Sequence, residues 1–282
     1  MTTNTYPNDP RVLEKLKNVK MFVLDMDGTI YLDRNPLPGA IEFCRMLDES
    51  GRLIYFTNNA SRSPLDYVKR LNDMGFPAAR KNILTSGDVT TAYLKKHHPG
   101  KPVYLLGTPT LAQSFEAEGI CLSEDADIVV VSFDKTLTYD KLEHACTLIR
   151  GGAKFYATHQ DINCPTASGF IPDCGAICEA IRLSTGVPPR YFGKPNQETA
   201  EMLCDFTGLK REEIAVVGDR LYTDIALGAK NGMLSILVMS GETTEEMRVS
   251  APEGQRAALV FHGVYELTPL LSGENGKENA AL

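Results

Sequence analysis

The chain has 282 residues and a formal net charge of −7, with 43% hydrophobic and 23% charged residues. This composition is typical of a soluble globular protein, and the length suits one large domain or two ordinary ones. The negative charge argues against nucleic acid as the main partner, because phosphate backbones select for basic surfaces. No apolar run approaches the roughly 20 residues that span a bilayer, so we expect no membrane partner.

The cellular location is predicted from the N-terminus and the cysteines. Residues 1–10 are polar and lack the basic and then apolar build of a signal peptide. The seven cysteines include no pair of C-x-x-C motifs, which argues against both a disulfide framework and a zinc site. We therefore expect a cytoplasmic protein with reduced thiols.

The first part of the chain alternates between predicted strands and helices. The apolar runs 21–24 and 53–56 predict two buried strands, and each run is closed by polar residues. Helices are expected over about 39–51 and 64–75, because the second begins with a Ser-Pro pair and both end at a glycine. This alternation is the signature of a parallel sheet covered by helices.

A second series of elements begins near Ser86. It has its own apolar runs and is long enough, at about 100 residues, to form a domain. Residues 161–175 are rich in Pro and Gly, so we expect a loop there. The expected helices are 88–97, 110–118, 139–150 and 176–184, and the expected strands are 103–106, 128–131 and 155–158.

The first pattern resumes after this segment, with a helix around 202–209 and strands at 214–217 and 234–238. The tail beyond Ser272 is expected to be frayed. We therefore predict an α/β fold, in which a Rossmann-like core with helices on both faces of a parallel sheet is interrupted by an inserted α/β domain. The predicted division is 1–85 for the first part of the core, 86–185 for the insertion and 186–282 for the second part.

Polar groups follow three of the predicted core strands. They are Asp25 and Asp27 after the first strand, Thr57 and Asn58 after the second, and Asp219 with Asp224 after the third. Ligands of open α/β sheets bind at the carboxyl ends of strands. Clustered carboxylates repel one another unless a proton or a cation lies between them, and Mg²⁺ prefers such oxygens. A single Asp at a strand end is more often a turn residue or a cap, but three such ends together favour a metal site.

These residue types suit the transfer of a phosphoryl group to a carboxylate. That reaction needs an Asp nucleophile, a metal, an acid for the leaving oxygen and fixed donors for the phosphate. Asp25 and Asp27 can supply the nucleophile and the acid, while Thr57 and Asn58 can supply the donors. Lys194 stands between a short apolar segment and a helix, where it can supply a further cation. The alternative interpretation of Lys194 is a solvated surface lysine.

Four polar segments occur in the order of the four motifs of a known family. They are residues 25–29 (DMDGT), 57–59 (TNN), 193–195 (GKP) and 218–224 (GDRLYTD). The chain therefore resembles the haloacid dehalogenase (HAD) superfamily, and within it subfamily IIA, the NagD and p-nitrophenyl-phosphatase branch. In that branch a C2-type α/β cap is inserted between the second and third motifs, where this chain has its own inserted series. The segment 132–139 (SFDKTLTY) also resembles the cap of this branch.

The resemblance implies roles for the acidic residues. Asp25 would be the nucleophile that becomes an aspartyl-phosphate, and it would also bind Mg²⁺. Asp27 would be the general acid and base, with its backbone carbonyl on the metal. Asp219 would be the third protein ligand of Mg²⁺, and Asp224 would orient the metal site.

The resemblance also implies how the phosphoryl group is bound. Thr57 and Asn58 would bind it, and Lys194 would neutralise both the phosphate and Asp25. An Asp at position 27 separates the branches of the superfamily, because its dehalogenases lack that acid and the Mg²⁺ site. Hydrolysis of a phosphate ester is therefore favoured.

Substrate selection is expected from residues in and beside the loop 161–175, which resembles the segment that closes over the leaving group. The candidates are His159, Asp161, Asn163 and Asp173. The family pattern more often has Pro-Gly-x-Gly where this chain has PDCG at 172–175. Asp173 would face a cationic or hydroxylated leaving group or cap the next helix, and capping is favoured because Asp is a preferred N-cap residue. His159 would contact substrate or be a structural residue, and a structural role is the commoner one for a lone histidine.

The predicted function is the Mg²⁺-dependent hydrolysis of small phosphorylated metabolites. Nucleotide monophosphates, sugar phosphates and pyridoxal phosphate are the candidate substrate classes. A phosphomutase would share the first steps, but the cap type speaks against it. A catalytically silent phospholigand-binding protein is the other alternative, and the intact set of Asp25, Asp27, Lys194 and Asp219 argues against it. The resemblance also suggests a homodimer formed through the cap.

Overall fold

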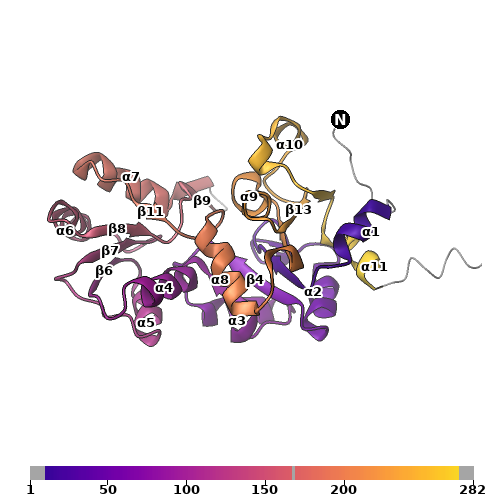
Figure 1. Cartoon of the computed structure of the whole chain (residues 1–282), viewed down its shortest axis with the longest axis horizontal. Coiled ribbons are helices and arrows are strands. Elements are labelled where there is room, and N and C mark those ends of the chain that lie inside the picture. Colours follow the sequence, from indigo (N-terminus) through magenta and orange to yellow (C-terminus); the bar gives the residue numbers. More distant parts are fainter. Residues whose placement is uncertain (1–9, 167–168, 273–282) are drawn as a thin grey trace, which may run out of the picture. The chain divides into compact units, whose positions relative to one another are not determined.

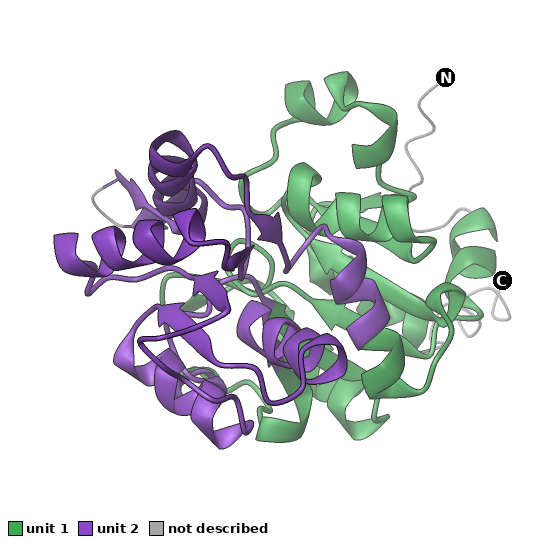
Figure 2. Ribbon diagram, turned by 60° about the vertical axis from the view of Figure 1, so that its left-hand side comes forward, with its two compact units in different colours: residues 1–56, 68–83, 203–282 green, residues 57–67, 84–202 purple. Residues whose placement is uncertain are grey.

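The computed structural model describes residues 10–166 and 169–272 (Figure 1). The predictions of a polar start before Pro10 and of a frayed tail beyond Ser272 lie outside these ranges. Within them, no helix is both long enough and apolar enough to cross a membrane. The chain divides into two compact units (Figure 2). Unit 1 contains the chain up to Phe56, residues 68–83 and the chain from Leu203, and unit 2 contains residues 57–67 and 84–202.

A six-stranded sheet forms the centre of unit 1, in the order β14-β13-β12-β1-β4-β5. Its strands are β1 (Met21–Leu24), β4 (Leu53–Thr57), β5 (Ile83–Thr85), β12 (Ile214–Gly218), β13 (Leu234–Val238) and β14 (Leu259–Phe261). β1 pairs in parallel with both β4 and β12, and β13 pairs in parallel with β12 and β14. Consecutive residues of β1 and β12 are buried, so both faces of the sheet are covered.

Helices and short turns surround this sheet. The helices are α1 (Pro10–Leu16), α2 (Ala40–Glu49), α9 (Ala226–Asn231), α10 (Glu245–Ser250) and α11 (Thr268–Leu271), while α3 (Pro64–Asp73) and α8 (Gln197–Thr207) each contribute to both units. α2 shows why such a segment is helical, because Phe43 and Leu47 are buried on one face and Phe43 packs edge-on against Phe22 of β1. The remaining short elements are a hairpin of β2 (Tyr31–Leu32) and β3 (Asn35–Pro36), a π-helical turn η3 (Leu221–Ile225), and 3₁₀ turns η1 (Arg80–Asn82), η2 (Arg211–Glu213), η4 (Glu253–Gln255) and η5 (Val264–Glu266).

Unit 2 contains a four-stranded parallel sheet in the order β11-β8-β7-β6. Its strands are β6 (Val103–Leu106), β7 (Ile128–Val131), β8 (Lys154–Ala157) and β11 (Arg190–Tyr191), and its helices are α4 (Ser86–His97), α5 (Pro109–Ala117), α6 (Tyr139–Arg150) and α7 (Cys174–Thr185). All four residues of β7 are buried, and α6 and α7 pack against the sheet through residues such as Ile149 and Ile177. The predicted α/β fold, a parallel sheet with helices on both faces, is therefore confirmed.

The structure differs from the sequence-based expectation in the Pro- and Gly-rich segment 161–175. That segment contains an antiparallel hairpin of β9 (Asn163–Thr166) and β10 (Gly169–Pro172), so the prediction of a loop without strands is wrong. Proline is compatible with a two-stranded hairpin, because strands at a sheet edge do not need every backbone N–H. The following helix also begins two residues earlier than predicted, at Cys174.

The short strands β5 and β14 have three residues each, and the hydrophobic pattern does not single them out. The boundaries of the two compact units differ from the predicted division into 1–85, 86–185 and 186–282, which stays a prediction.

Candidate active site

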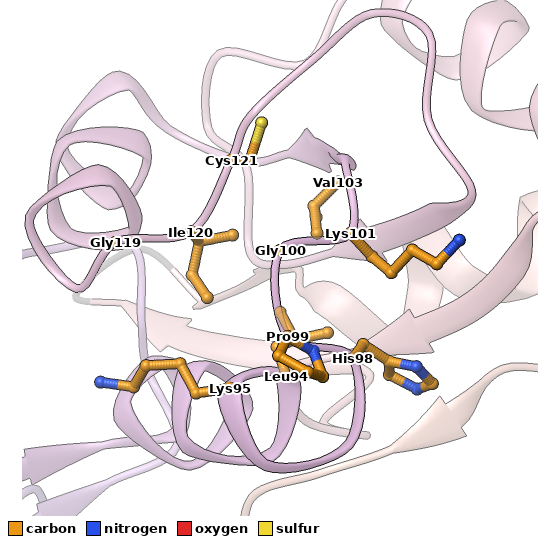
Figure 3. Close-up of a pocket in the computed structure, with 10 residues that line it drawn as sticks. All are labelled: Leu94, Lys95, His98, Pro99, Gly100, Lys101, Val103, Gly119, Ile120 and Cys121. Atoms are coloured by element: carbon orange, nitrogen blue, oxygen red, sulfur yellow. The ribbon is translucent and has the colours of Figure 1, made fainter.

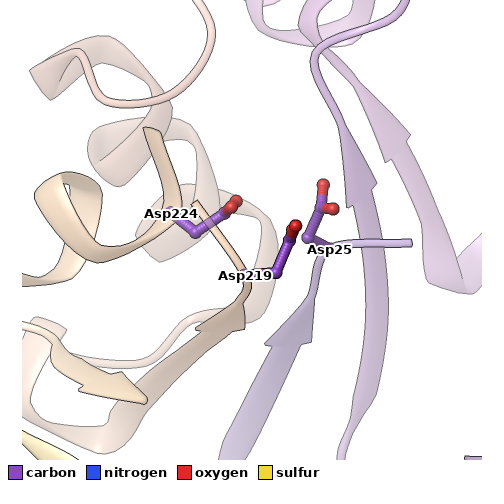
Figure 4. A group of neighbouring side chains, drawn as sticks. All are labelled: Asp25, Asp219 and Asp224. Atoms are coloured by element: carbon purple, nitrogen blue, oxygen red, sulfur yellow. The ribbon is translucent and has the colours of Figure 1, made fainter. Parts of the chain in front are cut away.

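Three carboxylates meet at the ends of two neighbouring strands of unit 1 (Figure 4). Asp25 directly follows β1 and Asp219 directly follows β12, and the parallel pairing of Leu24 with Val217 brings these two strand ends together. Asp224 lies in the π-helical turn η3 that follows β12. One oxygen of each carboxylate lies within 4.8 Å of the others. We call these three residues the acidic cluster.

Burial makes the acidic cluster electrostatically unfavourable without a cation. The exposed fraction is 2% for Asp219 and 0% for Asp224. Burial and the charge of Asp224 raise the pKa of Asp219 to about 6, although the backbone N–H of Glu242 and the charge of Arg220 oppose this shift. Because Mg²⁺ binds carboxylate oxygens and relieves such repulsion, the donor set of this cluster fits Mg²⁺.

Two glycines and a loop after β13 hold Asp219 in place. A Cβ at Gly28 or at Gly241 would overlap the Asp219 carboxylate, so only glycine allows this close approach. The backbone N–H of Glu242 donates to Asp219 Oδ2 at 2.7 Å, and the Thr243 hydroxyl donates to the Asp219 carbonyl. The sequence pattern does not single out residues 241–243, and the only signal for them is a glycine shortly after a buried strand.

Asp27 lies outside the acidic cluster and is exposed. The protein around it still removes enough water to raise the pKa of its carboxyl, against the opposing charges of Arg70 and Arg220. The turn that follows is closed by a hydrogen bond of 2.8 Å from the Gly28 N–H to the Tyr31 carbonyl. A carboxyl with a raised pKa keeps its proton to higher pH, which suits a group that donates a proton.

Arg220 is a partly buried cation beside the acidic cluster, and the sequence pattern assigns it no role. Burial lowers the pKa of its guanidinium, but the charges of Asp25 and other neighbours raise it further, so the net shift is upward. Its Nε lies 2.9 Å from Glu242 Oε2, and Tyr222 Oη donates to Glu242 Oε1 at 3.0 Å. Arg220 directly follows Asp219 in the sequence, and this position is the one signal that points to it.

In unit 2, the side chain of Asn58 brackets the backbone of Lys194. The Lys194 N–H donates to Asn58 Oδ1 at 2.8 Å, and Asn58 Nδ2 donates to the Lys194 carbonyl at 3.1 Å. The same Nδ2 lies 3.2 Å from Asp161 Oδ2. Because both ends of the Asn58 side-chain amide are already engaged, a contact of Asn58 with phosphate would use its backbone N–H. Thr57 Oγ1 accepts the Asn59 N–H at 3.1 Å, and a hydroxyl that accepts one bond can still donate its own hydrogen.

Lys194 follows β11 and is only 2% exposed, so its interpretation as a solvated surface lysine is wrong. Gly193 has a φ of +66°, which favours glycine. A Cβ at Gly193 would lie 2.7 Å from Asn58 Oδ1 and 2.9 Å from the Thr158 carbonyl. The glycine of this segment therefore lets the backbone before Lys194 pack tightly against its neighbours.

Three of the four residues predicted to select substrate are buried. His159 has no exposed surface, and its Nε2 lies 2.9 Å from Asp173 Oδ1. Asp173 also caps α7, because its Oδ1 accepts the Cys174 N–H at 2.6 Å. Asp161 is 8% exposed, whereas Asn163 is exposed at the start of β9. The cap favoured for Asp173 is thus observed.

A separate pocket of about 150 Å³ lies in unit 2, beside the C-terminal end of α4 (Figure 3). Lys95, His98, Lys101 and Cys121 are among its lining residues. Lys95 pairs with Glu118 at 2.5 Å and Lys101 pairs with Asp127 at 2.8 Å, so both cations are already balanced. None of the residues predicted to act in catalysis or binding lines this pocket.

Mg²⁺ should raise the melting temperature of the protein more at about pH 7.5 than at about pH 5, because protons compete with metals for carboxylates. The folded-state pKa of Asp219, about 6, is raised, so the metal-free protein loses stability as this group ionises with rising pH. At a concentration about 100 times its Kd, Mg²⁺ should raise the melting temperature by about 5–10 °C at the higher pH. Differential scanning fluorimetry measures both shifts, and equal shifts at the two pH values would contradict the assignment.

Two glycine variants test the position of the metal site, one as the test and one as its matched control. Gly241→Ala should abolish the Mg²⁺-dependent shift, because the added Cβ displaces the Asp219 carboxylate. Gly254→Ala in η4 should retain the shift, because the atoms nearest to its Cβ belong to the flexible side chain of Lys230. A normal shift in Gly241→Ala would show that the loop after β13 does not position the metal site.

Comparison with known families matches two stretches of the chain. A model described as haloacid dehalogenase-like hydrolase matches residues 22–121, and a model described as HAD-hydrolase-like matches residues 191–267. The first stretch includes Asp25 and Asn58, and the second includes Lys194. All four polar segments that follow strands therefore lie inside the matched stretches.

Several named phosphatases are similar to this chain over most of its length. The acid sugar phosphatase of Staphylococcus saprophyticus is 36% identical over 234 residues, which are 82% of this chain and 90% of the relative. The 4-nitrophenylphosphatase of Thermotoga maritima is 44% identical with a TM-score of 0.85, over 90% of this chain and 97% of that one. The glycerol phosphate phosphatase Rv1692 of Mycobacterium tuberculosis was solved in complex with magnesium. It is 30% identical with a TM-score of 0.83, over 90% of this chain and 77% of that one. With the geometry described above, these similarities show that the chain belongs to the haloacid dehalogenase-like hydrolases and is a phosphatase of their NagD-like branch.

Proposed function

We propose that the chain hydrolyses small phosphate monoesters with Mg²⁺, through an aspartyl-phosphate on Asp25. The observation that carries this proposal is the approach of Asp25, Asp219 and Asp224 to within 4.8 Å at the ends of β1 and β12. This arrangement combines a carboxylate nucleophile with oxygen donors that suit Mg²⁺, and phosphoryl transfer to an aspartate requires both.

Mg²⁺ would be held by Asp25, Asp219 and the backbone carbonyl of Asp27. Asp224 would orient this site from its buried position, where its Oδ2 accepts the Arg220 N–H at 3.2 Å. When bound, the ion supplies positive charge to the phosphoryl oxygens and to the nucleophile. The magnesium complex of the related glycerol phosphate phosphatase supports this cofactor.

The reaction would use the two acids of the first motif for different tasks. The Asp25 carboxylate attacks phosphorus, and the ester oxygen leaves with a proton from the Asp27 carboxyl. Asp27, now a carboxylate, then takes a proton from water, and the hydroxide oxygen bonds to phosphorus as the Asp25–phosphorus bond breaks. Inorganic phosphate and the original protonation state of both residues result. A positioned acid and base contribute about 10²–10⁴-fold to such a reaction.

Thr57, Asn58 and Lys194 would bind the transferring phosphoryl group. The Thr57 hydroxyl and the Asn58 backbone would donate hydrogen bonds to its oxygens. Lys194 would contribute a positive charge that water screens little, because its side chain is buried. The bracket of Asn58 around the Lys194 backbone supports this assignment, since it fixes the start of the lysine side chain.

Sugar phosphates are the substrate class that we propose. The curated relatives are named acid sugar phosphatases, and the one from Staphylococcus saprophyticus aligns over 82% of this chain. A panel of sugar phosphates, nucleotide monophosphates and pyridoxal phosphate at saturating Mg²⁺ tests the class. A higher kcat/KM for either of the other two classes would overturn this choice.

Asp25→Asn should lower the hydrolysis of p-nitrophenyl phosphate by at least about 10⁴-fold, because the amide is a poor nucleophile. Circular dichroism should show an unchanged fold, since Asp25 and Asn have nearly the same volume. A turnover close to that of the unmodified protein would exclude Asp25 as the nucleophile.

Asp27→Asn should affect substrates according to their leaving group. For an alkyl phosphate such as a sugar phosphate, kcat/KM should fall by about 10²–10⁴-fold, because the strongly basic leaving oxygen needs a proton. For p-nitrophenyl phosphate the loss should be much smaller, because the nitrophenolate leaves without one. The ratio kcat/KM is the appropriate measurement, since it reports the steps up to the release of the leaving group. Equal losses on both substrates would argue against Asp27 as the acid.

A further inference from the structure

A buried ion pair lies in unit 2, formed by His159 and Asp173. The imidazole has no exposed surface, and Asp173 is 4% exposed. His159 Nε2 lies 2.9 Å from Asp173 Oδ1, and a carboxylate can only accept, so Nε2 carries a proton. Neither side chain has the solvent access that a direct contact with a diffusing substrate needs.

The other ring nitrogen, Nδ1, faces two hydroxyl groups. His159 Nδ1 lies 2.9 Å from Thr158 Oγ1 and 3.4 Å from Ser86 Oγ. Thr158 Oγ1 gives its hydrogen to Ser132 Oγ at 3.0 Å, and Ser86 Oγ gives its hydrogen to the Asn58 carbonyl at 2.5 Å. In this arrangement both hydroxyl oxygens can accept a hydrogen from Nδ1, which favours the imidazolium form of His159.

The environment of His159 favours this charged form. Burial by itself lowers the pKa of the imidazole, but the neighbouring Cys174, the hydrogen bond with Asp173 and the charges of Asp173 and Asp161 raise it above its ordinary value. An imidazolium that donates to a carboxylate on one side and to hydroxyls on the other has both of its N–H groups satisfied.

This ion pair is connected to Lys194 by two routes. Ser86 links it to the backbone of Asn58, whose side chain brackets the Lys194 N–H and carbonyl. Directly, His159 packs against Gly193, where an added Cβ would lie 3.1 Å from His159 Cβ. The N-terminus of α7 and the backbone of Lys194 therefore belong to one hydrogen-bonded network.

We propose that His159 and Asp173 are positioning residues, which fix the backbone of Lys194 through Ser86 and Asn58. The charged pair is held at the N-terminus of α7, where Asp173 is also the cap, so it gives the network a rigid anchor. Its function in catalysis rests on the phosphate-binding role proposed above for Lys194. A loss of either charge leaves the other buried and unbalanced, and the bracket around Lys194 loosens.

Asp173→Asn is the sharpest test, because asparagine is also a good N-cap residue but lacks the negative charge. The variant should lower kcat and weaken inhibition by inorganic phosphate, each by about 10- to 100-fold, since small displacements of catalytic groups have effects of this size. Thr138→Ala is the matched control, because it removes the cap of α6 in the same unit, where Thr138 Oγ1 accepts the Lys141 N–H at 3.3 Å. The control should leave both constants within about twofold of the unmodified protein.

Hydrogen exchange gives a readout that does not depend on activity. In the unmodified protein, the Lys194 N–H is protected by its bond to Asn58 Oδ1. Asp173→Asn should increase deuterium uptake in the peptide that contains Lys194, and Thr138→Ala should not. If Asp173→Asn fails to fold by circular dichroism, His159→Gln replaces it, because glutamine keeps a neutral donor for Asp173.

The outcomes separate the inference from the proposed function. Unchanged uptake at Lys194 and an unchanged phosphate inhibition constant would overturn the positioning role, even in a fully active phosphatase. Equal effects of Asp173→Asn and Thr138→Ala would also overturn it, because they would indicate a general loss of stability. If the unmodified protein hydrolyses no phosphate ester, the proposed function falls, and hydrogen exchange at Lys194 still decides whether the network positions that residue.

Discussion

The parallel pairing of β1 with β12 ends with two carboxylates side by side, Asp25 and Asp219, and the repulsion between them governs the chemistry of the chain. Asp224 adds a third negative charge in a place without solvent. Such a group of charges is stable only with a cation or with protons, and the raised pKa of Asp219 shows how close it is to taking a proton. The same repulsion makes a divalent cation the natural partner of this strand edge, because its binding removes the electrostatic cost.

Both units hold their charged groups by close backbone packing. In unit 1, Gly28 and Gly241 allow the chain to lie against the Asp219 carboxylate. In unit 2, Gly193 allows the chain before Lys194 to lie against Asn58. A rigid frame of this kind suits catalysis, since groups that are already oriented need no reorganisation as charge develops. It also explains why a change as small as one methyl group is expected to affect function at these positions.

Much of the fold could be predicted because the central strands are short apolar runs closed by polar residues. The acidic residues at their ends could also be predicted, since the carboxyl ends of parallel strands converge. The hairpin β9–β10 could not, because its Pro- and Gly-rich sequence resembles that of a loop and its pairing depends on the backbone. Arg220 and Glu242 have no distinctive local pattern, and their importance comes from a contact between segments that are distant in the sequence. The sequence leaves His159 open to two interpretations, because a single histidine does not reveal its partner. In the structure it is buried against Asp173.

Chemical trapping tests directly whether an aspartyl-phosphate forms on Asp25. The protein is mixed with Mg²⁺ and p-nitrophenyl phosphate, quenched in acid during turnover, digested and analysed by mass spectrometry. We expect a phosphoryl adduct on the peptide that contains Asp25, located at that residue by fragmentation and removed by hydroxylamine, as is typical of an acyl phosphate. Turnover with the adduct on another residue would contradict this mechanism. Turnover of p-nitrophenyl phosphate by Asp27→Asn, in which the second step should be slowed, without any trapped adduct would also contradict it.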